Sequence, residues 1–142
     1  MEKYIGTKII EAWVGWNDER AQSGYRVVYA DGYSSWSPLF AFEEAYRMIA
    51  PGNAVLTFGD AVHLLKLGHK VTRAGWNGKG MFLFLVPGSQ FKVSRPPLLG
   101  IYPEGTEINY RPHIDMKTAD GSVSTWNPTC NDVLAEDWMV VE

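Results

Sequence analysis

The chain has 142 residues, a formal net charge of −3, 46% hydrophobic residues and 20% charged residues, the composition of a folded soluble protein with one domain or two very small ones. The acidic balance argues against a long nucleic acid as partner, because such binding rests on neutralising many phosphates, whereas a small nucleotide needs only one or two cations. Cys130 is the only cysteine, so no internal disulfide can form. The longest apolar run, residues 81–86, is far too short to span a bilayer, so we expect a cytosolic protein.

The first part of the chain has the composition of a small β-sheet. Residues 4–13 mix β-branched and aromatic side chains and predict a strand. Residues 24–29 and 33–36 have the same composition, and the turn dipeptide Asp31-Gly32 lies between them. An Asp-Gly turn between two such runs is typical of a β-hairpin.

A helix is predicted directly after this hairpin. Ser37 is typical of an N-cap residue and Pro38 of the first helical position. Apolar residues then follow at helical spacing up to about Ile49, namely Leu39, Phe42, Tyr46 and Ile49. The breaker sequence at residues 51–53 ends the helix. We therefore expect an amino-terminal hairpin-helix unit over residues 1–53 and a second domain over residues 54–142.

The second domain begins with a strong helix signal. Thr57 and Asp60 form a capping-box-like Thr-x-x-Asp pair before an apolar run. The residues that follow at i, i+3, i+4 and i+7 are apolar, namely Phe58, Ala61, Val62 and Leu65. Gly68 is well placed just beyond the end of this helix, so we expect an amphipathic helix over residues 58–67.

The rest of the second domain predicts strands. They cover residues 69–74, 81–86, 91–93, 113–118, 122–126 and 138–141, with a glycine-rich turn at residues 75–80 and an Asp-Gly hairpin turn at Asp120-Gly121. Residues 95–111 hold three of the eight prolines and predict a long loop. The predicted fold class is α+β, a small antiparallel sheet packed by one amphipathic helix.

The sequence offers few candidates for catalytic residues. The three histidines have no metal-ligand spacing to each other or to carboxylates, and a lone Cys130 is better explained as a buried side chain than as a nucleophile. Asp120 lies in a turn, where Asp is expected for conformational reasons, and Glu136-Asp137 is most simply a solvated loop. We therefore predict no catalytic residues, no metal site and no cofactor.

The sequence offers more candidates for residues that bind a nucleotide. Around the glycine-rich turn stand two cations, an indole and an amide, namely Arg73, Lys79, Trp76 and Asn77. Glycines let backbone N–H groups approach a phosphate, and an exposed indole can stack on a base. An ordinary hairpin turn with a core-facing Trp76 explains the pattern about equally well. For Trp126, a second indole at a strand end, packing against the following loop is slightly favoured.

Five sequence blocks follow one another in a specific order. They are Thr-Phe-Gly-Asp-Ala from Thr57, Val-Thr-Arg-x-Gly-Trp-Asn-Gly-Lys ending at Lys79, Met-Lys-Thr-Ala-Asp-Gly ending at Gly121, Trp126, and Asp-Val-Leu-Ala-Glu-Asp-Trp from Asp132. Together they resemble the second type of Thoeris anti-defence family of phages and prophages, over about residues 54–142. Residues 1–53 and the loop 95–111 lie outside this pattern and receive no role from it.

The resemblance implies a non-enzymatic molecular sponge. Members of the family sequester a cyclic ADP-ribose isomer made by bacterial TIR-domain proteins, some hold cyclic oligonucleotides, and they assemble as homotetramers. By position, Trp76 and Trp126 would stack on the adenine. The other candidate ligand-binding residues are Arg73, Asn77, Lys79, Thr118, Asp120 and Asp132. The resemblance places the protein in the cytoplasm of the bacterial host.

Two functions of other classes remain as alternatives. One is a phage structural or protein-interaction module in which the aromatic side chains form an interface patch. The other, a nucleotide hydrolase, is disfavoured because it needs a general base or a metal set that the sequence does not offer.

Overall fold

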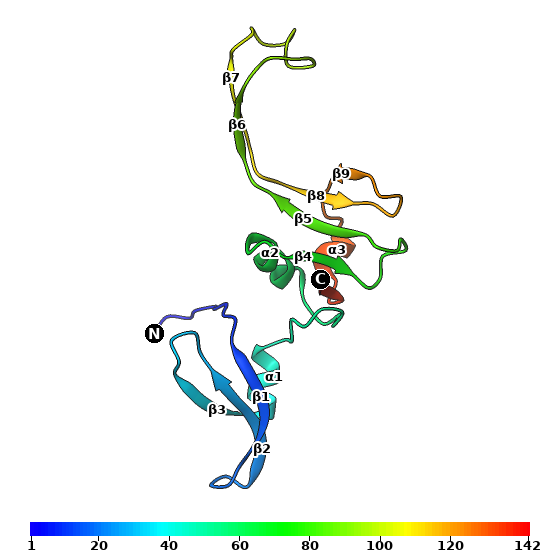
Figure 1. The fold of residues 1–142 in the computed structure, drawn as a ribbon. Coiled ribbons are helices and arrows are strands. Elements are labelled where there is room, and N and C mark those ends of the chain that lie inside the picture. The colour runs from blue at the N-terminus through cyan, green and yellow to red at the C-terminus, as the bar shows by residue number, and fades with distance from the viewer. The chain divides into compact units, whose positions relative to one another are not determined.

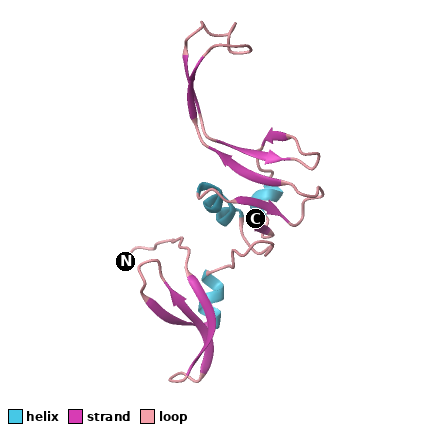
Figure 2. Ribbon diagram, in the orientation of Figure 1, coloured by secondary structure: helices cyan, strands magenta, loops and turns pink.

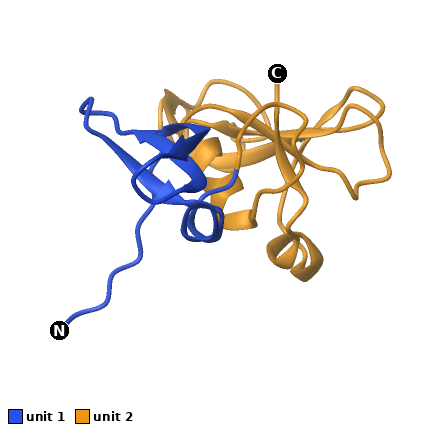
Figure 3. Ribbon diagram, turned by 90° about the horizontal axis from the view of Figure 1, so that it is seen from below, with its two compact units in different colours: residues 1–47 blue, residues 48–142 orange.

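The computed structural model describes residues 1–142, and the chain forms two compact units, residues 1–47 and residues 48–142 (Figure 3). Antiparallel strands dominate and helices are few (Figure 2), which confirms the predicted α+β class. No helix combines the length and the apolar character that crossing a membrane requires.

Unit 1 is a three-stranded antiparallel sheet with one short helix (Figure 1). Its strands are β1 (Glu11–Asn17), β2 (Gln22–Val28) and β3 (Ser34–Pro38), in the order β1-β2-β3, followed by α1 (Leu39–Ala45). The hairpin predicted around Asp31-Gly32 is present, and Gly32 has a φ of 87°. The prediction of a strand from residue 4 was wrong, because β2 ends at Val28, opposite Glu11, and earlier residues have no partner.

The helix of unit 1 is shorter than predicted. Pro38 ends β3 and lies at the N-cap position rather than inside the helix, and Tyr46 returns to an extended conformation. The Phe42 ring stacks on Tyr25 at 3.9 Å, and Tyr46 stacks on Phe42 at 4.9 Å. This aromatic column holds α1 against one face of the sheet. The helix ends at Ala45, so the fourth apolar residue of the predicted stripe, Ile49, is not part of it.

Unit 2 is a five-stranded antiparallel sheet in the order β10-β4-β5-β8-β9. Its elements are α2 (Phe58–Lys66), β4 (Lys70–Arg73), β5 (Phe82–Val86), β8 (His113–Lys117), β9 (Val123–Thr125), α3 (Cys130–Leu134) and β10 (Trp138–Val141). The core lies between α2 and the sheet and contains the buried side chains Leu56, Leu64, Leu65, Val71, Leu83 and Trp138.

The start and the end of α2 are as predicted. The Thr57 hydroxyl accepts a hydrogen bond from the Asp60 amide at 3.2 Å, and the Asp60 carboxylate accepts one from the Thr57 amide at 2.9 Å. Gly68 follows the helix with a φ of 92°. Local capping chemistry therefore determines both ends of this helix.

Two elements of unit 2 were not predicted. Helix α3 starts at a second capping box, Thr129 and Asp132, with the same Thr-x-x-Asp spacing as α2. The predicted loop 95–111 is wrong at its end, where β7 (Glu107–Tyr110) pairs with β6 (Ser89–Lys92). These two strands extend the β5 and β8 pair into a long hairpin arm (Figure 1).

Residues 48–53 belong with unit 2, although they were assigned to the amino-terminal unit. Ile49 packs against the core of unit 2, and the Gly52 amide donates a hydrogen bond to the Val140 carbonyl at 3.2 Å. The segment therefore packs against the core of unit 2 and is hydrogen-bonded to β10.

We expect a chain starting at Met48 to be more stable than one starting at Ala54. The shorter chain loses the Ile49 contacts and the hydrogen bond to Val140, which should lower the free energy of unfolding by about 1–3 kcal/mol. Urea denaturation followed by tryptophan fluorescence measures this difference. Equal stability of the two chains would show that residues 48–53 contribute nothing to unit 2.

Candidate functional site

Four aromatic rings meet at one end of unit 2, contributed by α2, the turn after β4, the segment after β9 and the start of β10. Trp138, fully buried, makes edge-on contacts with Trp76 and Trp126 at centroid distances of 5.4 and 6.1 Å. The Trp76 and Trp126 rings lie 6.3 Å apart, and Phe58 contacts both Trp126 and Trp138. We call these four residues the aromatic cluster.

The cluster combines the two interpretations that the sequence left open for its indoles. Trp76 and Trp126 pack against the core, but unlike Trp138 each keeps part of its surface exposed. They are therefore core residues on one side and accessible rings on the other.

The Asp132 carboxylate lies beside the cluster and is fully hydrogen-bonded. Its Oδ1 accepts from Arg73 Nη1 at 2.8 Å and from Trp76 Nε1 at 3.1 Å. Its Oδ2 accepts from the amide and the hydroxyl of Thr129, both at 2.9 Å. The backbone carbonyl of the same residue accepts from Trp138 Nε1 at 3.0 Å. One aspartate thus joins the cap of α3 to β4, to the glycine-rich turn and to β10.

Arg73 links this aspartate to a second carboxylate. Its Nε donates to Asp137 Oδ1 at 2.9 Å, while the other oxygen of Asp137 accepts from the Gly75 amide at 2.7 Å. A Cβ at Gly75 would lie only 2.8 Å from that carboxylate, so the glycine is needed for this approach. The prediction that Asp137 belongs to a solvated loop was wrong, because its carboxylate is half-buried and paired.

The charges of this group are matched to one another. Burial acts to raise the pKa of Asp132, but hydrogen bonds from Thr129, Arg73 and Trp76 outweigh it and lower the pKa to about 2. Burial also acts to raise the pKa of Asp137, and the bonds from Arg73 and Gly75 lower it overall. The pKa of Arg73 is raised, chiefly by its hydrogen bond to Asp137. All three groups are therefore charged at neutral pH.

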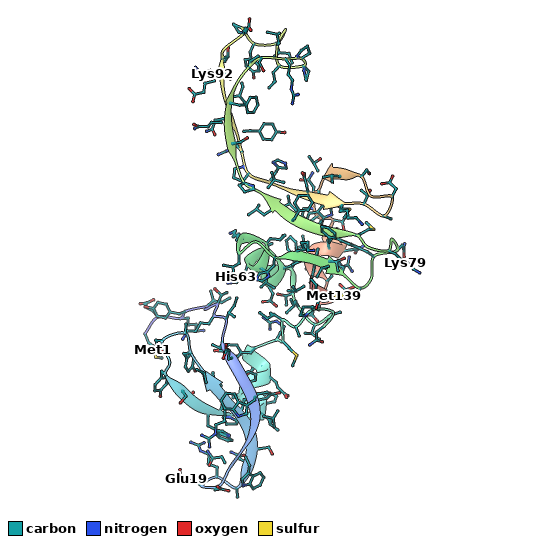
Figure 4. The ribbon with its side chains drawn as sticks, viewed as in Figure 1. Met1, Glu19, His63, Lys79, Lys92 and Met139 are labelled. Atoms are coloured by element: carbon teal, nitrogen blue, oxygen red, sulfur yellow. The ribbon has the colours of Figure 1, made fainter.

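Two predicted site residues face solvent on the glycine-rich turn. Asn77 and Lys79 are exposed, and Lys79 lies at the tip of the turn and points away from the sheet (Figure 4). The structure gives no internal partner to either side chain. They are the polar groups of this turn that a ligand can reach without breaking the network around Asp132.

The other two candidates, Thr118 and Asp120, lie in the turn between β8 and β9. Asp120 Oδ1 accepts from the Ser122 amide at 2.9 Å, the Ser122 hydroxyl at 2.6 Å and the Thr118 hydroxyl at 2.5 Å. These bonds, with the Ser122 hydroxyl first, lower the pKa of Asp120 to about 2. The conformational role expected for an aspartate in a turn is therefore present.

The two turns touch each other. Lys117 Nζ donates to the Gly80 carbonyl at 3.1 Å, and a Cβ at Gly78 would lie 3.0 Å from the Ala119 Cβ. A hollow of about 580 Å³ adjoins the glycine-rich turn, and Trp76, Arg73, Gly78 and Gly80 line it together with residues of β10 and Pro51-Gly52. Trp76 thus belongs both to the aromatic cluster and to the wall of this hollow.

Four members of the site were not predicted from the sequence. The residues that complete the site but were not predicted as site residues are Phe58, Thr129, Asp137 and Trp138. For Thr129, the Thr-x-x-Asp spacing was a usable signal. Cys130, the first residue of α3, was expected to be buried and is exposed instead. No group of three or more His, Cys, Asp or Glu side chains is arranged to hold a metal ion.

We expect replacement of Asp132 by Asn to destabilise unit 2 by about 3 kcal/mol at pH 7, since it leaves Arg73 partly unpaired in a half-buried setting. The folded-state pKa of Asp132 lies below its ordinary value, so its stabilising effect is complete above about pH 5 and is lost as the pH falls towards 2. The variant should therefore show a flatter decline of the free energy of unfolding between about pH 5 and 2.

The exposed neighbour Glu136 provides the matched control. Glu136→Gln should stay within about 0.5 kcal/mol of the unaltered protein. Urea denaturation at a series of pH values measures both variants. If Asp132→Asn kept the pH dependence of the unaltered protein, the assigned network would be wrong.

The match to known proteins covers unit 2. The sequence profile of the Thoeris anti-defense 2-like domain matches residues 56–141. A curated relative, Thoeris anti-defense 2 of Bacillus phage SP01, is 42% identical over 86 residues, which are 61% of this chain and 94% of the relative. The matched region contains every predicted site residue, whereas unit 1 lies outside it. The chain therefore belongs to the Thoeris anti-defense 2-like family, which supports a role in phage anti-defence.

Proposed function

We propose that this protein binds a cyclic ADP-ribose isomer and sequesters it without cleavage, so that TIR-dependent immunity in the cytoplasm of the bacterial host stays inactive. The proposal includes assembly as a homotetramer and extends to cyclic oligonucleotides as further ligands. Membership of the family and the phage relative named Thoeris anti-defense 2 support it.

The observation that carries the proposal is the partly exposed, firmly held pair Trp76 and Trp126. Both indoles pack on the buried Trp138, and Trp76 is also hydrogen-bonded to Asp132. A ring already fixed in position loses little conformational freedom when a base stacks on it. Stacking on an aromatic side chain contributes about 1–3 kcal/mol per base.

The surroundings of Trp76 fit a nucleotide. The adjoining hollow of about 580 Å³ has the size of a small-molecule site. Lys79 and Asn77 are exposed on the same turn, so they are suited to contact a phosphate and a base or ribose edge. Arg73 and Asp132 hold the turn in place, and Thr118 and Asp120 shape the adjacent turn.

The first test asks whether the ligand survives. The full chain is incubated with a cyclic ADP-ribose isomer, the free ligand is removed, and the protein is heated to release what it holds. Chromatography should recover the ligand unchanged after any incubation time, and light scattering should report a tetramer. Product that accumulates with time would identify a hydrolase, and the absence of bound ligand would overturn the proposal.

The second test concerns the two indoles. Trp76→Ala and Trp126→Ala should each weaken binding about tenfold or more, measured by calorimetry, because each removes a stacking surface. Trp→Phe at the same positions should preserve the fold and lose less affinity. Lys79→Ala should weaken binding more at low salt than at high salt, because exposed charges are screened.

The control is Tyr33→Ala, which removes an exposed ring from unit 1 and should leave affinity unchanged. Thermal unfolding of each variant separates loss of the site from loss of the core. Tryptophan variants that melt far lower but bind normally where folded would show that both rings have only a packing role.

A further inference from the structure

Unit 1 lies outside the region that the family profile matches, and its strand β1 is an unprotected edge. The strand order β1-β2-β3 leaves one side of β1 without a partner. Its exposed side chains include Trp13 and Trp16, each 56% exposed, and Val14, 63% exposed. Edge strands of this kind are templates for pairing with another strand.

The other edge strand of the same sheet, β3, is protected against pairing with a further strand. Strand β3 has five residues, three of them serines, and ends at Pro38. Short length, polar side chains and proline all discourage pairing. Strand β1 has seven residues, Glu11–Asn17, with no proline, no lysine and Glu11 as its only charge. The two edges of one small sheet therefore differ in their readiness to accept a further strand.

The sequence of β1 is complementary to itself when it is paired antiparallel about Val14. This register brings Trp13 opposite Gly15 and Trp16 opposite Ala12, so each large ring meets a small residue. Glu11 meets Asn17, which places no like charges side by side, and Val14 meets its own copy. Cross-strand pairs of this kind stabilise a sheet, whereas opposed like charges destabilise it.

The rows across the sheet show the same complementarity. In each copy, Trp13, Arg26 and Trp36 form one row across the three strands, and Gly15, Gly24 and Pro38 form the next row on the same face. The Trp36 indole donates to the Gly15 carbonyl at 3.3 Å, and the Arg26 stem lies close above Gly15. Self-pairing about Val14 continues the bulky row of one copy into the glycine row of the other.

We propose that unit 1 is a dimerisation module in which β1 pairs antiparallel with β1 of a second copy of this chain, with Val14 on the two-fold axis. The result is a continuous six-stranded sheet, an isologous contact with closed two-fold symmetry. The proposal is independent of the ligand site in unit 2, so either can fail without the other.

Charges introduced at position 14, on the proposed two-fold axis, test the register of the β1–β1 pair. In the full chain, Val14→Lys and Val14→Glu each place like charges opposite one another, so the apparent mass in analytical ultracentrifugation should fall below that of the uncharged control Val14→Thr. An equimolar mixture of the two charged variants should restore the control mass, because opposite charges then meet. Circular dichroism confirms that each variant keeps its fold.

Cross-linking provides a second readout. In a Cys130→Ser background, Val14→Cys should form a disulfide-linked dimer under mild oxidation, because directly opposed strand positions bring the two Cβ atoms within bonding reach. Ser23→Cys, exposed on the central strand β2, should not. Equal cross-linking at both positions, an unchanged mass for Val14→Lys, or a mixture that fails to reassociate would overturn the proposal. Loss of association on deleting residues 1–10 would also overturn it, because the contact between copies would then depend on the amino-terminal segment rather than on β1.

Discussion

The carboxylate of Asp132 is the group on which the candidate site depends. It caps α3 through Thr129, accepts from the Arg73 guanidinium of β4 and holds the Trp76 indole of the glycine-rich turn. A buried charge is costly unless all its hydrogen-bonding positions are filled, and here both oxygens are. Because the donors come from separate elements, filling them forces those elements into one arrangement. Trp138 reinforces it by donating to the Asp132 carbonyl.

This constraint divides the polar and aromatic residues in and beside the glycine-rich turn into two kinds. Arg73 is a cation in the right place for a phosphate, but two carboxylates already occupy it. Its positive charge therefore stabilises the site rather than facing outward. Lys79 and Asn77, in contrast, have the freedom that a ligand contact needs. Trp76 has both roles, since its ring nitrogen is engaged internally while part of its ring remains exposed.

The two units of the chain present different kinds of surface. Unit 2 offers concave polar and aromatic surface next to a rigid network, which suits a small ligand. Unit 1 offers an unpaired strand edge with exposed indoles, which suits a protein strand. If both proposals hold, one chain joins a domain that binds a ligand to a surface that mediates assembly. Association through unit 1 would then raise the number of ligand sites per particle without altering any one of them.

Local chemistry in the sequence determined the capped helix α2, the Asp-Gly hairpins and most strands of unit 2, because caps and turns are satisfied by residues close in sequence. A Thr-x-x-Asp capping box also precedes α3, but the helix has only five residues, which are too few to show a helical periodicity. Tertiary structure decided where α1 ends, since Ile49 continues its apolar spacing yet packs on the core of unit 2. It also decided β7, which is a strand because β6 lies beside it. Above all, Arg73 finds Asp132 and Asp137 at separations of 59 and 64 residues, and no pattern within a short window can report a partner that only the folded sheet brings near.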